Sequence, residues 1–209
     1  MNEFDTLFEA LKITEPPLQK EIRTHAVIED YPKGVFVVEQ EKYIKWLAIV
    51  IRGTVRVWQE EEDREILLYY VNPLETCSLS LAATFKDYKS LVHARTENNT
   101  TLIKIPVRFV KQWSFEYQSW FRFTTQSFIT SYEDLLISYK SLAFKRIEER
   151  LYDYIIHSKE LCNNKLLISH KALANELGTT REVISRLLKQ MEDEGLLKLH
   201  FKMIELIKS

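Results

Sequence analysis

Five short runs rich in β-branched and aromatic residues lie between Tyr31 and Ile105, and a helical pattern replaces them from Val107 onward. Runs of this kind, separated by turn or charge signals, predict the strands of a compact antiparallel β-barrel or sandwich. They cover residues 34–38, 47–51, 54–58, 66–70 and 101–105. The Arg52-Gly53 pair predicts a tight turn, and the charged segment 60–64 is typical of an exposed hairpin tip.

Aromatic side chains dominate the helix that we expect from about Val107 to Tyr139. Alternating steps of four and three residues place one set of them on a single seam, as in a coiled coil, which predicts a dimer interface. The seam consists of Phe121, Thr125, Phe128, Tyr132, Leu135 and Tyr139. The alternative is a stripe that packs on the chain's own β-domain. We favour dimerisation, since Trp113, Tyr117 and Trp120 fall on another face that could cover that domain.

The segment 141–209 has the pattern helix, helix, turn, helix and hairpin. Two short helices that cross steeply need a small residue where they touch and a glycine where the chain reverses. Ala174 lies four residues before Gly178, while Ile184 and Leu187 follow it by six and nine. This spacing predicts a helix-turn-helix, although ordinary helical hairpins also show apolar residues at such intervals.

Hydroxyl residues mark where both helices of this motif begin. Ser169 is placed to cap the helix 170–177, and Thr180 to cap the helix 180–193. Each hydroxyl can accept a hydrogen bond from a free backbone N–H of the first turn. The predicted helices therefore start at defined residues.

The polar side of the second helix is chemically suited to DNA. Arginine can donate two hydrogen bonds to guanine, glutamate can accept one from cytosine, and a helix N-terminus favours phosphate. Two short runs, 196–199 and 203–207, predict a hairpin wing whose lysines could contact phosphate. The candidate DNA-binding residues are Ser169, Thr179, Thr180, Arg181, Glu182, Ser185, Arg186, Lys189 and Lys202. A merely solvated face is the alternative interpretation.

The segment 178–189, followed by 192–196, resembles the winged helix of Crp/Fnr-type transcription regulators. The resemblance continues in 31–34 and 51–57, which are similar to the family's β-roll strands, and the aromatic helix falls where the family has its dimer helix. It implies an α+β chain with an N-terminal antiparallel, jelly-roll-like β-roll, a long dimerisation helix and a C-terminal winged helix-turn-helix. The three parts would cover residues 1–106, 107–140 and 141–209.

The function implied by this resemblance is sequence-specific DNA binding by a homodimer on a palindromic site. In the family, the positions of Arg181, Glu182 and Arg186 read bases, so the resemblance implies direct readout by these residues. RNA polymerase is a further candidate partner. We keep open a second function, in which the β-roll senses a ligand and the winged helix contacts a protein instead of DNA.

The effector cassette departs from the family's pattern. Members that bind cyclic AMP hold its phosphate with a Gly-Glu pair and, about ten residues later, an arginine beside a small hydroxyl residue. Here Leu74 precedes Glu75, Lys89 precedes Ser90, and the stretch contains no arginine. Because lysine lacks the two-pronged guanidinium, the cassette argues against cyclic AMP or GMP. Glu75, Lys89 and Ser90 are candidate residues for another small effector, or for none.

Other chemistries have weaker support. His25 or His93 could ligate haem iron, although a lone histidine is more often structural. Cys77 and Cys162 are isolated, so we expect no iron–sulfur or zinc site. An enzyme is not expected, because the chain has no Gly-rich phosphate loop, no Ser/His/Asp spacing and no HExxH motif.

Charge and hydropathy set the remaining expectations. The residues before Ser141 include 17 basic and 20 acidic side chains, and those from Ser141 onward 12 and 10, a net of +2. This net charge is too small to indicate nucleic-acid binding by itself. Residues 1–13 have helical spacing and lack the features of a signal peptide, and no run is long enough to span a membrane. We therefore expect a cytoplasmic protein without a membrane partner.

Overall fold

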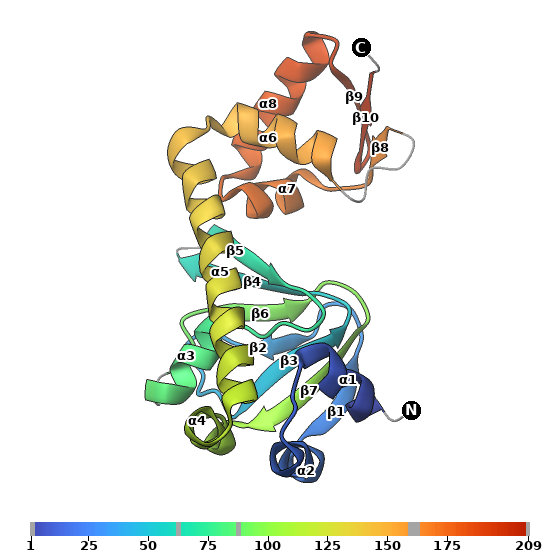
Figure 1. Cartoon of the computed structure of the whole chain (residues 1–209). Coiled ribbons are helices and arrows are strands. Elements are labelled where there is room, and N and C mark those ends of the chain that lie inside the picture. The colour runs from blue at the N-terminus through green and yellow to red at the C-terminus, as the bar shows by residue number, and fades with distance from the viewer. Residues whose placement is uncertain (1–2, 62–63, 87–88, 159–163, 208–209) are drawn as a thin grey trace. The chain divides into compact units, whose positions relative to one another are not determined.

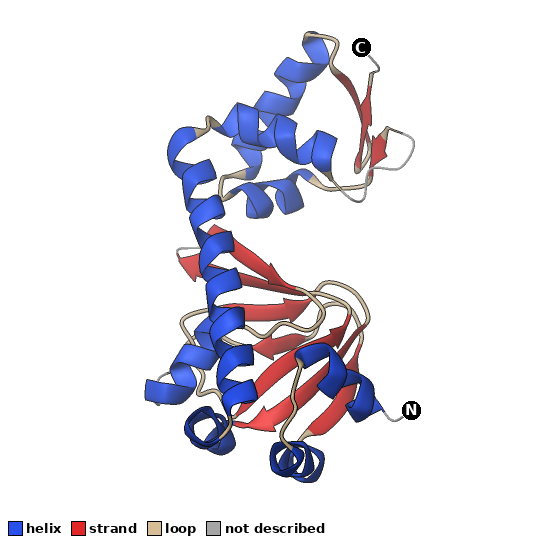
Figure 2. Cartoon of the chain, in the orientation of Figure 1, coloured by secondary structure: helices blue, strands red, loops and turns tan. Residues whose placement is uncertain are grey.

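A computed structural model describes residues 3–61, 64–86, 89–158 and 164–207, so Cys162 lies outside the described residues (Figure 1). Figure 2 shows the same chain coloured by helix and strand. The chain forms two compact units, one of residues 1–59 with 68–136 and the other of residues 60–67 with 137–209. None of the described helices is long and apolar enough to cross a membrane.

Two antiparallel sheets form the β-part of the chain. The first has the strand order β1-β7-β3 and the second the order β2-β6-β4-β5. The strands are β1 (Val27–Tyr31), β2 (Phe36–Val38), β3 (Trp46–Arg52), β4 (Val55–Glu61), β5 (Arg64–Val71), β6 (His93–Thr96) and β7 (Thr100–Pro106). Each of the five predicted runs overlaps a strand, although Gly34, Val35 and Thr54 lie outside the strands, and β1 and β6 are additional. Neither strand stands out in a hydrophobicity pattern, because β1 contains the adjacent acidic residues Glu29 and Asp30, and β6 has a single apolar residue, Ala94.

An apolar layer fills the space between the two sheets. Val50 of β3 and Leu102 of β7 face Val57, Val71 and Ala94 of the other sheet, and all of these side chains are buried. Alternate residues of β3 and β7, such as Ile49 and Ile103, point to the opposite face and pack against the helices. Because successive side chains of a strand point to opposite faces, one strand can serve both layers.

Gly53 connects strands of two different sheets. It follows β3 and precedes β4, which do not pair with each other, so the predicted turn carries the chain from one sheet to the next. Its φ of +87° lies in the region that favours glycine. A Cβ at this position would come within 2.5 Å of Thr100 Oγ1 and 2.7 Å of the Asn99 carbonyl. Both the conformation and the space therefore require glycine.

The helices of the first unit cover the outer face of the β1-β7-β3 sheet. They are α1 (Glu3–Leu11), α2 (Pro16–His25), α3 (Ser78–Lys86), α4 (Val107–Glu116) and the first part of α5 (Gln118–Phe144). The expected covering role of Trp113 and Trp120 is confirmed, since both are fully buried in the core beneath these helices.

The single helix expected over 107–139 is wrong in two respects. The chain leaves the helical conformation at Tyr117, with φ −125° and ψ 119°, so that α4 and α5 are separate helices. The Tyr117 hydroxyl donates to Glu21 at 2.9 Å, and Trp113 Nε1 donates to the same carboxylate at 2.5 Å. This tertiary contact supports the break, which helical periodicity alone does not reveal. In addition, α5 continues past Tyr139 to Phe144.

The second unit contains the expected succession of helices followed by a hairpin. Its elements are α6 (Ile147–His157), β8 (Lys165–Leu166), α7 (His170–Leu177), α8 (Arg181–Asp193), β9 (Leu197–His200) and β10 (Met203–Leu206). The strands form an antiparallel sheet in the order β8-β10-β9. Leu151 and Ile155 of α6 pack with Ile184 of α8 and Ile204 of β10 in one apolar core.

We predict that Gly53→Ala lowers the free energy of unfolding by about 2–4 kcal/mol, through left-handed strain and steric overlap together. Gly34→Ala is the matched control, since Gly34 has φ +90° but a Cβ there would meet nothing within 4 Å. It should cost only the strain, about 1 kcal/mol. Urea unfolding followed by tryptophan fluorescence measures both, because Trp46, Trp58, Trp113 and Trp120 all lie in the first unit. Equal losses in the two variants would contradict the steric argument.

Candidate nucleic-acid interface

The junction of α7 and α8 is defined by two hydroxyl caps and one glycine. Ser169 Oγ accepts a hydrogen bond from the backbone N–H of Ala172 at 3.1 Å, and Thr180 Oγ1 accepts one from that of Val183 at 3.4 Å. Gly178 ends α7 in the left-handed conformation, with φ 61° and ψ 43°. Both predicted caps and the predicted glycine turn are confirmed.

The small core beneath this junction holds the two helices at a fixed crossing. Ala174 is buried at the contact, together with Ile184 and Leu187 from α8. Arg150 of α6 donates to the Leu177 carbonyl at 2.5 Å, so it satisfies a carbonyl at the end of α7 that has no helical partner. Burial lowers the pKa of Arg150.

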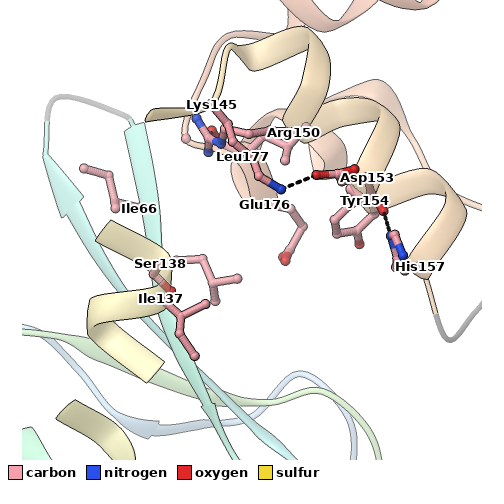
Figure 3. Close-up of a pocket in the computed structure, with 12 residues that line it drawn as sticks. Ile66, Ile137, Ser138, Lys145, Arg150, Asp153, Tyr154, His157, Glu176 and Leu177 are labelled. Carbon is pink, nitrogen blue, oxygen red and sulfur yellow. Dashed lines mark hydrogen bonds and ion pairs between the residues drawn. The ribbon is translucent and has the colours of Figure 1, made fainter. Parts of the chain in front are cut away.

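Figure 3 shows the side chains that line a pocket beside α6 and α7, with Arg150 and Leu177 among them. Lys145 pairs with the Asp153 carboxylate at 2.5 Å, and the Asp153 backbone carbonyl accepts a hydrogen bond from His157 Nδ1 at 2.9 Å. Close donation from the lysine lowers the pKa of Asp153. Asp153, His157 and Arg150 of α6 thus all have partners within this unit.

The charged face of α8 is exposed on the side away from the core. Arg181, Glu182, Arg186 and Lys189 are exposed, and Ser185 is half-buried among them. Within the part of the chain that the structure describes, no carboxylate forms an ion pair with Arg181 or Arg186. The structure therefore brings two arginines without an ion pair to the first half of one helix.

Two other charges on this face have local partners. Lys189 Nζ lies 2.9 Å from Glu192 and 3.2 Å from Asp193, so its charge is partly compensated within α8. The pKa of Glu182 is lowered, because its carboxylate accepts hydrogen bonds from its own backbone N–H and from Thr180. Glu182 therefore stays ionised in the first turn, where a negative charge is favourable.

His170 is a contact on this face that the sequence interpretation missed. Its Nδ1 lies 2.8 Å from the Ser185 hydroxyl, which links the first turn of α7 to the exposed side of α8. Partial burial and, to a lesser extent, the charge of Arg181 lower the pKa of His170. The only sequence signal is its place directly after the capping serine.

The remaining candidate DNA-binding residues frame α8. Thr179 and Thr180 are half-buried in the turn, and Ser169 is half-buried at the start of α7. Lys202 is exposed in the turn between β9 and β10, with φ +54°. A helix with one exposed charged face, packed in a three-helix core beside a β-hairpin, is the geometry of a winged helix-turn-helix, a DNA-binding module.

Comparison with known proteins supports this assignment for the C-terminal part and shows a shared fold for the whole chain. A family model described as a Crp-like helix-turn-helix domain matches residues 148–208. No curated protein sequence matches the chain. A structure from Eubacterium rectale, assigned to the Crp/Fnr family of transcriptional regulators, is 25% identical, with a TM-score of 0.87 over 98% of this chain and 95% of that one.

Two further structures share the fold. The c-di-GMP-responsive regulator CLP of Xanthomonas campestris is 22% identical, with a TM-score of 0.75 over 93% of this chain and 100% of its own. TTHB099 of Thermus thermophilus, a regulator of the CRP family, is 15% identical, with a TM-score of 0.69 over 86% and 92%. The chain thus carries a Crp-like helix-turn-helix and the Crp/Fnr fold along its length. The three matched structures are those of regulators, and two of them are described as transcriptional regulators of the Crp/Fnr or CRP family.

The three candidate effector residues have separate surroundings. The Glu75 carboxylate accepts a hydrogen bond from the Asn72 backbone N–H at 2.9 Å. Lys89 lies 4.0 Å from Glu41 and over the ring of Tyr43. The buried Ser90 hydroxyl donates to the Val92 carbonyl at 2.7 Å and accepts from its N–H at 3.2 Å. Each group already has a partner within the β-roll.

The interior of the β-roll offers little room. The cavity between the sheets measures about 20 Å³ and is lined by Val50, Cys77, Ser80 and other small or apolar side chains. This is close to the space of a single water. A groove of about 400 Å³ does lie beside Glu75, between Leu11 of α1 and Arg122 of α5, but neither Lys89 nor Ser90 lines it.

Both candidate haem ligands stack on aromatic rings. The His25 ring lies 4.2 Å from that of Phe109, and the His93 ring lies 5.2 Å from that of Trp58. His93 Nδ1 also accepts a hydrogen bond from the Gln40 backbone at 3.3 Å. Among the described residues there is no group of three or more His, Cys, Asp or Glu side chains that could hold a metal ion.

We predict that His170 titrates below its usual pKa of about 6.5. Because the folded-state pKa is lowered, the unfolded chain binds the proton more tightly. The neutral imidazole therefore stabilises the fold fully above pH about 6.5, and this contribution is lost as the pH falls towards the folded-state pKa. An NMR titration of the five histidines, with His170→Gln to assign the signal, checks the direction. A titration midpoint above 6.5 would refute it.

Proposed function

We propose that the protein is a homodimer that reads a palindromic DNA site with α8. The observation that carries the proposal is the pair of exposed arginines, Arg181 and Arg186, which have no ion pair with a described residue. Such guanidinium groups can donate two parallel hydrogen bonds to a guanine edge in the major groove. Glu182 would accept from a cytosine, since its lowered pKa keeps it ionised.

The phosphate backbone would be bound by groups that surround α8. The capped first turns of α7 and α8 present backbone N–H groups next to Ser169 and Thr180, which suits phosphate oxygens. Thr179 and Lys202 would add further backbone contacts. Ser185 and Lys189 would act at the edge of the base-reading face, because His170 and the Glu192–Asp193 pair already engage them in part.

The exposed seam of α5 supports the dimer. Phe121, Phe128, Tyr132 and Tyr139 are between 48% and 64% exposed in the single chain, with Leu135 at 37% and Thr125 also exposed. The opposite face of the helix is buried and includes Trp120 and Phe123. A helix that buries one apolar face and leaves a second, aromatic face uncovered is suited to pair with a second copy.

Dimerisation also explains how a short helix could reach useful specificity. Two copies related by a twofold axis would place two α8 helices in successive major grooves, about one helical turn apart.

We propose that the β-roll responds to a small effector other than cyclic AMP or GMP, with the groove beside Glu75 as the roomier site. A cytoplasmic location and contact with RNA polymerase follow if DNA binding controls transcription.

The readout prediction concerns Arg186. Arg186→Ala should weaken binding to the preferred duplex by about 1–3 kcal/mol and relax the preference at one base position. A duplex selected from a random library with the wild-type chain provides the site, and titrations on that duplex and on a scrambled one give both affinities. Arg108→Ala, at an exposed arginine of α4, is the control and should bind like wild type. Equal losses on both duplexes would contradict direct readout by Arg186.

The dimer prediction concerns the seam. Tyr132→Asp should convert the dimer to a monomer, because a charge would be desolvated at the centre of an apolar interface. Sedimentation equilibrium should give twice the chain mass of 24.9 kDa for wild type and one chain mass for the variant. Tyr43→Asp, which changes a 67% exposed tyrosine elsewhere, should remain dimeric. A monomeric wild type would refute the proposal.

Absence of any salt-sensitive duplex binding would instead favour a role of the winged helix in protein contacts. DNA binding of the proposed kind releases counterions, so the affinity must fall steeply as salt rises. The same titrations at several salt concentrations therefore separate the two functions.

A further inference from the structure

A buried cysteine and a buried hydroxyl share the cavity between the two sheets. Cys77 is 8% exposed and Ser80 is 2% exposed, and both line this cavity of about 20 Å³. Within the described part of the chain, Ser80 Oγ has no hydrogen-bond partner. Buried polar atoms almost always have such a partner. The unsatisfied hydroxyl therefore points to a polar atom that enters the cavity beside Cys77.

Two hydrogen-bond donors surround the Cys77 sulfur. Sγ accepts from the backbone N–H of Ser80 at 3.4 Å, as an N-cap side chain does at the start of α3. The Tyr69 hydroxyl lies 3.5 Å from the same sulfur and 3.0 Å from Ser78 Oγ. Burial raises the pKa of Tyr69, so the phenol keeps its proton and can donate it to a thiolate. The thiolate is the nucleophilic form of cysteine.

The backbone before Cys77 is fixed on β3. The Thr76 hydroxyl donates to the Ala48 carbonyl at 2.7 Å, and the Val50 N–H donates to the Glu75 carbonyl at 3.0 Å. These two hydrogen bonds hold the segment against the sheet on both sides of the bend. The sulfur is therefore kept at the wall of the cavity.

The cavity limits the size of what can enter it. Its volume is close to that of one water, and most of its other walls are apolar, including Val50, Val71 and Ala94. The oxygen of a sulfenic acid on Cys77 would fill this space and bring a polar atom to Ser80 Oγ. A larger group would have to displace close-packed side chains. The site therefore suits hydrogen peroxide as the reagent.

We infer that Cys77 is a site of reversible oxidation by hydrogen peroxide. The thiolate sulfur would attack one peroxide oxygen, so that an S–O bond forms and the O–O bond breaks. The other oxygen leaves as hydroxide, and the proton released by the thiol converts it to water. Sulfur is oxidised to sulfenic acid, which a thiol can reduce again, and the peroxide is reduced. Ser80 Oγ would hydrogen-bond to the oxygen that stays on sulfur. This oxidation goes beyond the proposed DNA binding and is measured without DNA.

The experiment oxidises the folded full-length chain with hydrogen peroxide. After the oxidant is removed by desalting, the chain is unfolded in urea that contains dimedone, which traps sulfenic acids. Tryptic mapping by mass spectrometry then separates Cys77 from Cys162, because the two lie on different peptides. The Cys77 peptide should carry the adduct. With tert-butyl hydroperoxide the adduct should form at least about tenfold more slowly, since the added methyl groups have no space in the cavity.

Ser80→Ala separates an oxidation site from a merely structural cavity. Loss of the unsatisfied hydroxyl should raise the melting temperature followed by tryptophan fluorescence, because a buried polar atom without a partner is removed. Oxidation of Cys77 should become about five- to tenfold slower, because the transferred oxygen loses a hydrogen bond. A structural role alone predicts only the first change. Ser131→Ala, at a buried serine of α5 outside the cavity lining, is the matched control and should be oxidised like wild type.

Three outcomes would overturn the inference. One is an unmodified Cys77 in folded wild type under conditions that oxidise free cysteine, which would leave the cavity to a structural water. Another is an equal rate with the two hydroperoxides, which would place the reaction outside this cavity. The third is a wild-type rate of oxidation in Ser80→Ala. Failure of the proposed DNA binding would alter none of these measurements, so the two proposals are tested separately.

Discussion

The Glu21 carboxylate supports the break that gives α5 its direction. It accepts hydrogen bonds from Trp113 at the end of α4 and from Tyr117 in the break, so the chain turns before α5 begins. Donation to this carboxylate raises the pKa of Tyr117, which keeps the phenol protonated. The turn lets Trp113 and Trp120 meet edge to face, with ring centres 5.2 Å apart, inside the core of the first unit. In a continuous helix, these two rings would not be brought together in this way.

The direction of α5 decides which of its two faces is buried and which is exposed. Trp120 and Phe123 face the core, and Thr124, Ser127 and Ser131 continue the buried face with small side chains. The Thr124 hydroxyl donates to the Trp120 carbonyl one turn earlier, so its burial leaves no unsatisfied donor. The aromatic seam is left on the other side, where a second copy could cover it. One helix thus closes the β-roll and offers the surface on which the proposed dimer depends.

The stretch that holds the cyclic-AMP phosphate in other members of the family does not have its usual residues in this chain. Leu74 adopts a positive φ of 71° without being glycine, and its side chain is 40% exposed. The backbone bend is therefore present, while the glycine and the arginine are absent. The roll interior is filled by its own valines and leaves about 20 Å³. An effector of nucleotide size therefore fits the groove beside Glu75 better than the space between the sheets.

The sequence by itself determined the features that depend on neighbours along the chain. Caps at Ser169 and Thr180, the glycine turn at Gly178 and the alternation of the β-runs all act within a few residues, so their spacing is sufficient evidence. The exposed arginines of α8 follow from helical periodicity in the same way. Only tertiary structure decided the break at Tyr117, the strands β1 and β6, and the contact of His170 with Ser185. Each of these depends on a partner 15 or more residues away, and hydrophobic patterning carries no signal for a single hydrogen bond or for a charged strand at such a distance.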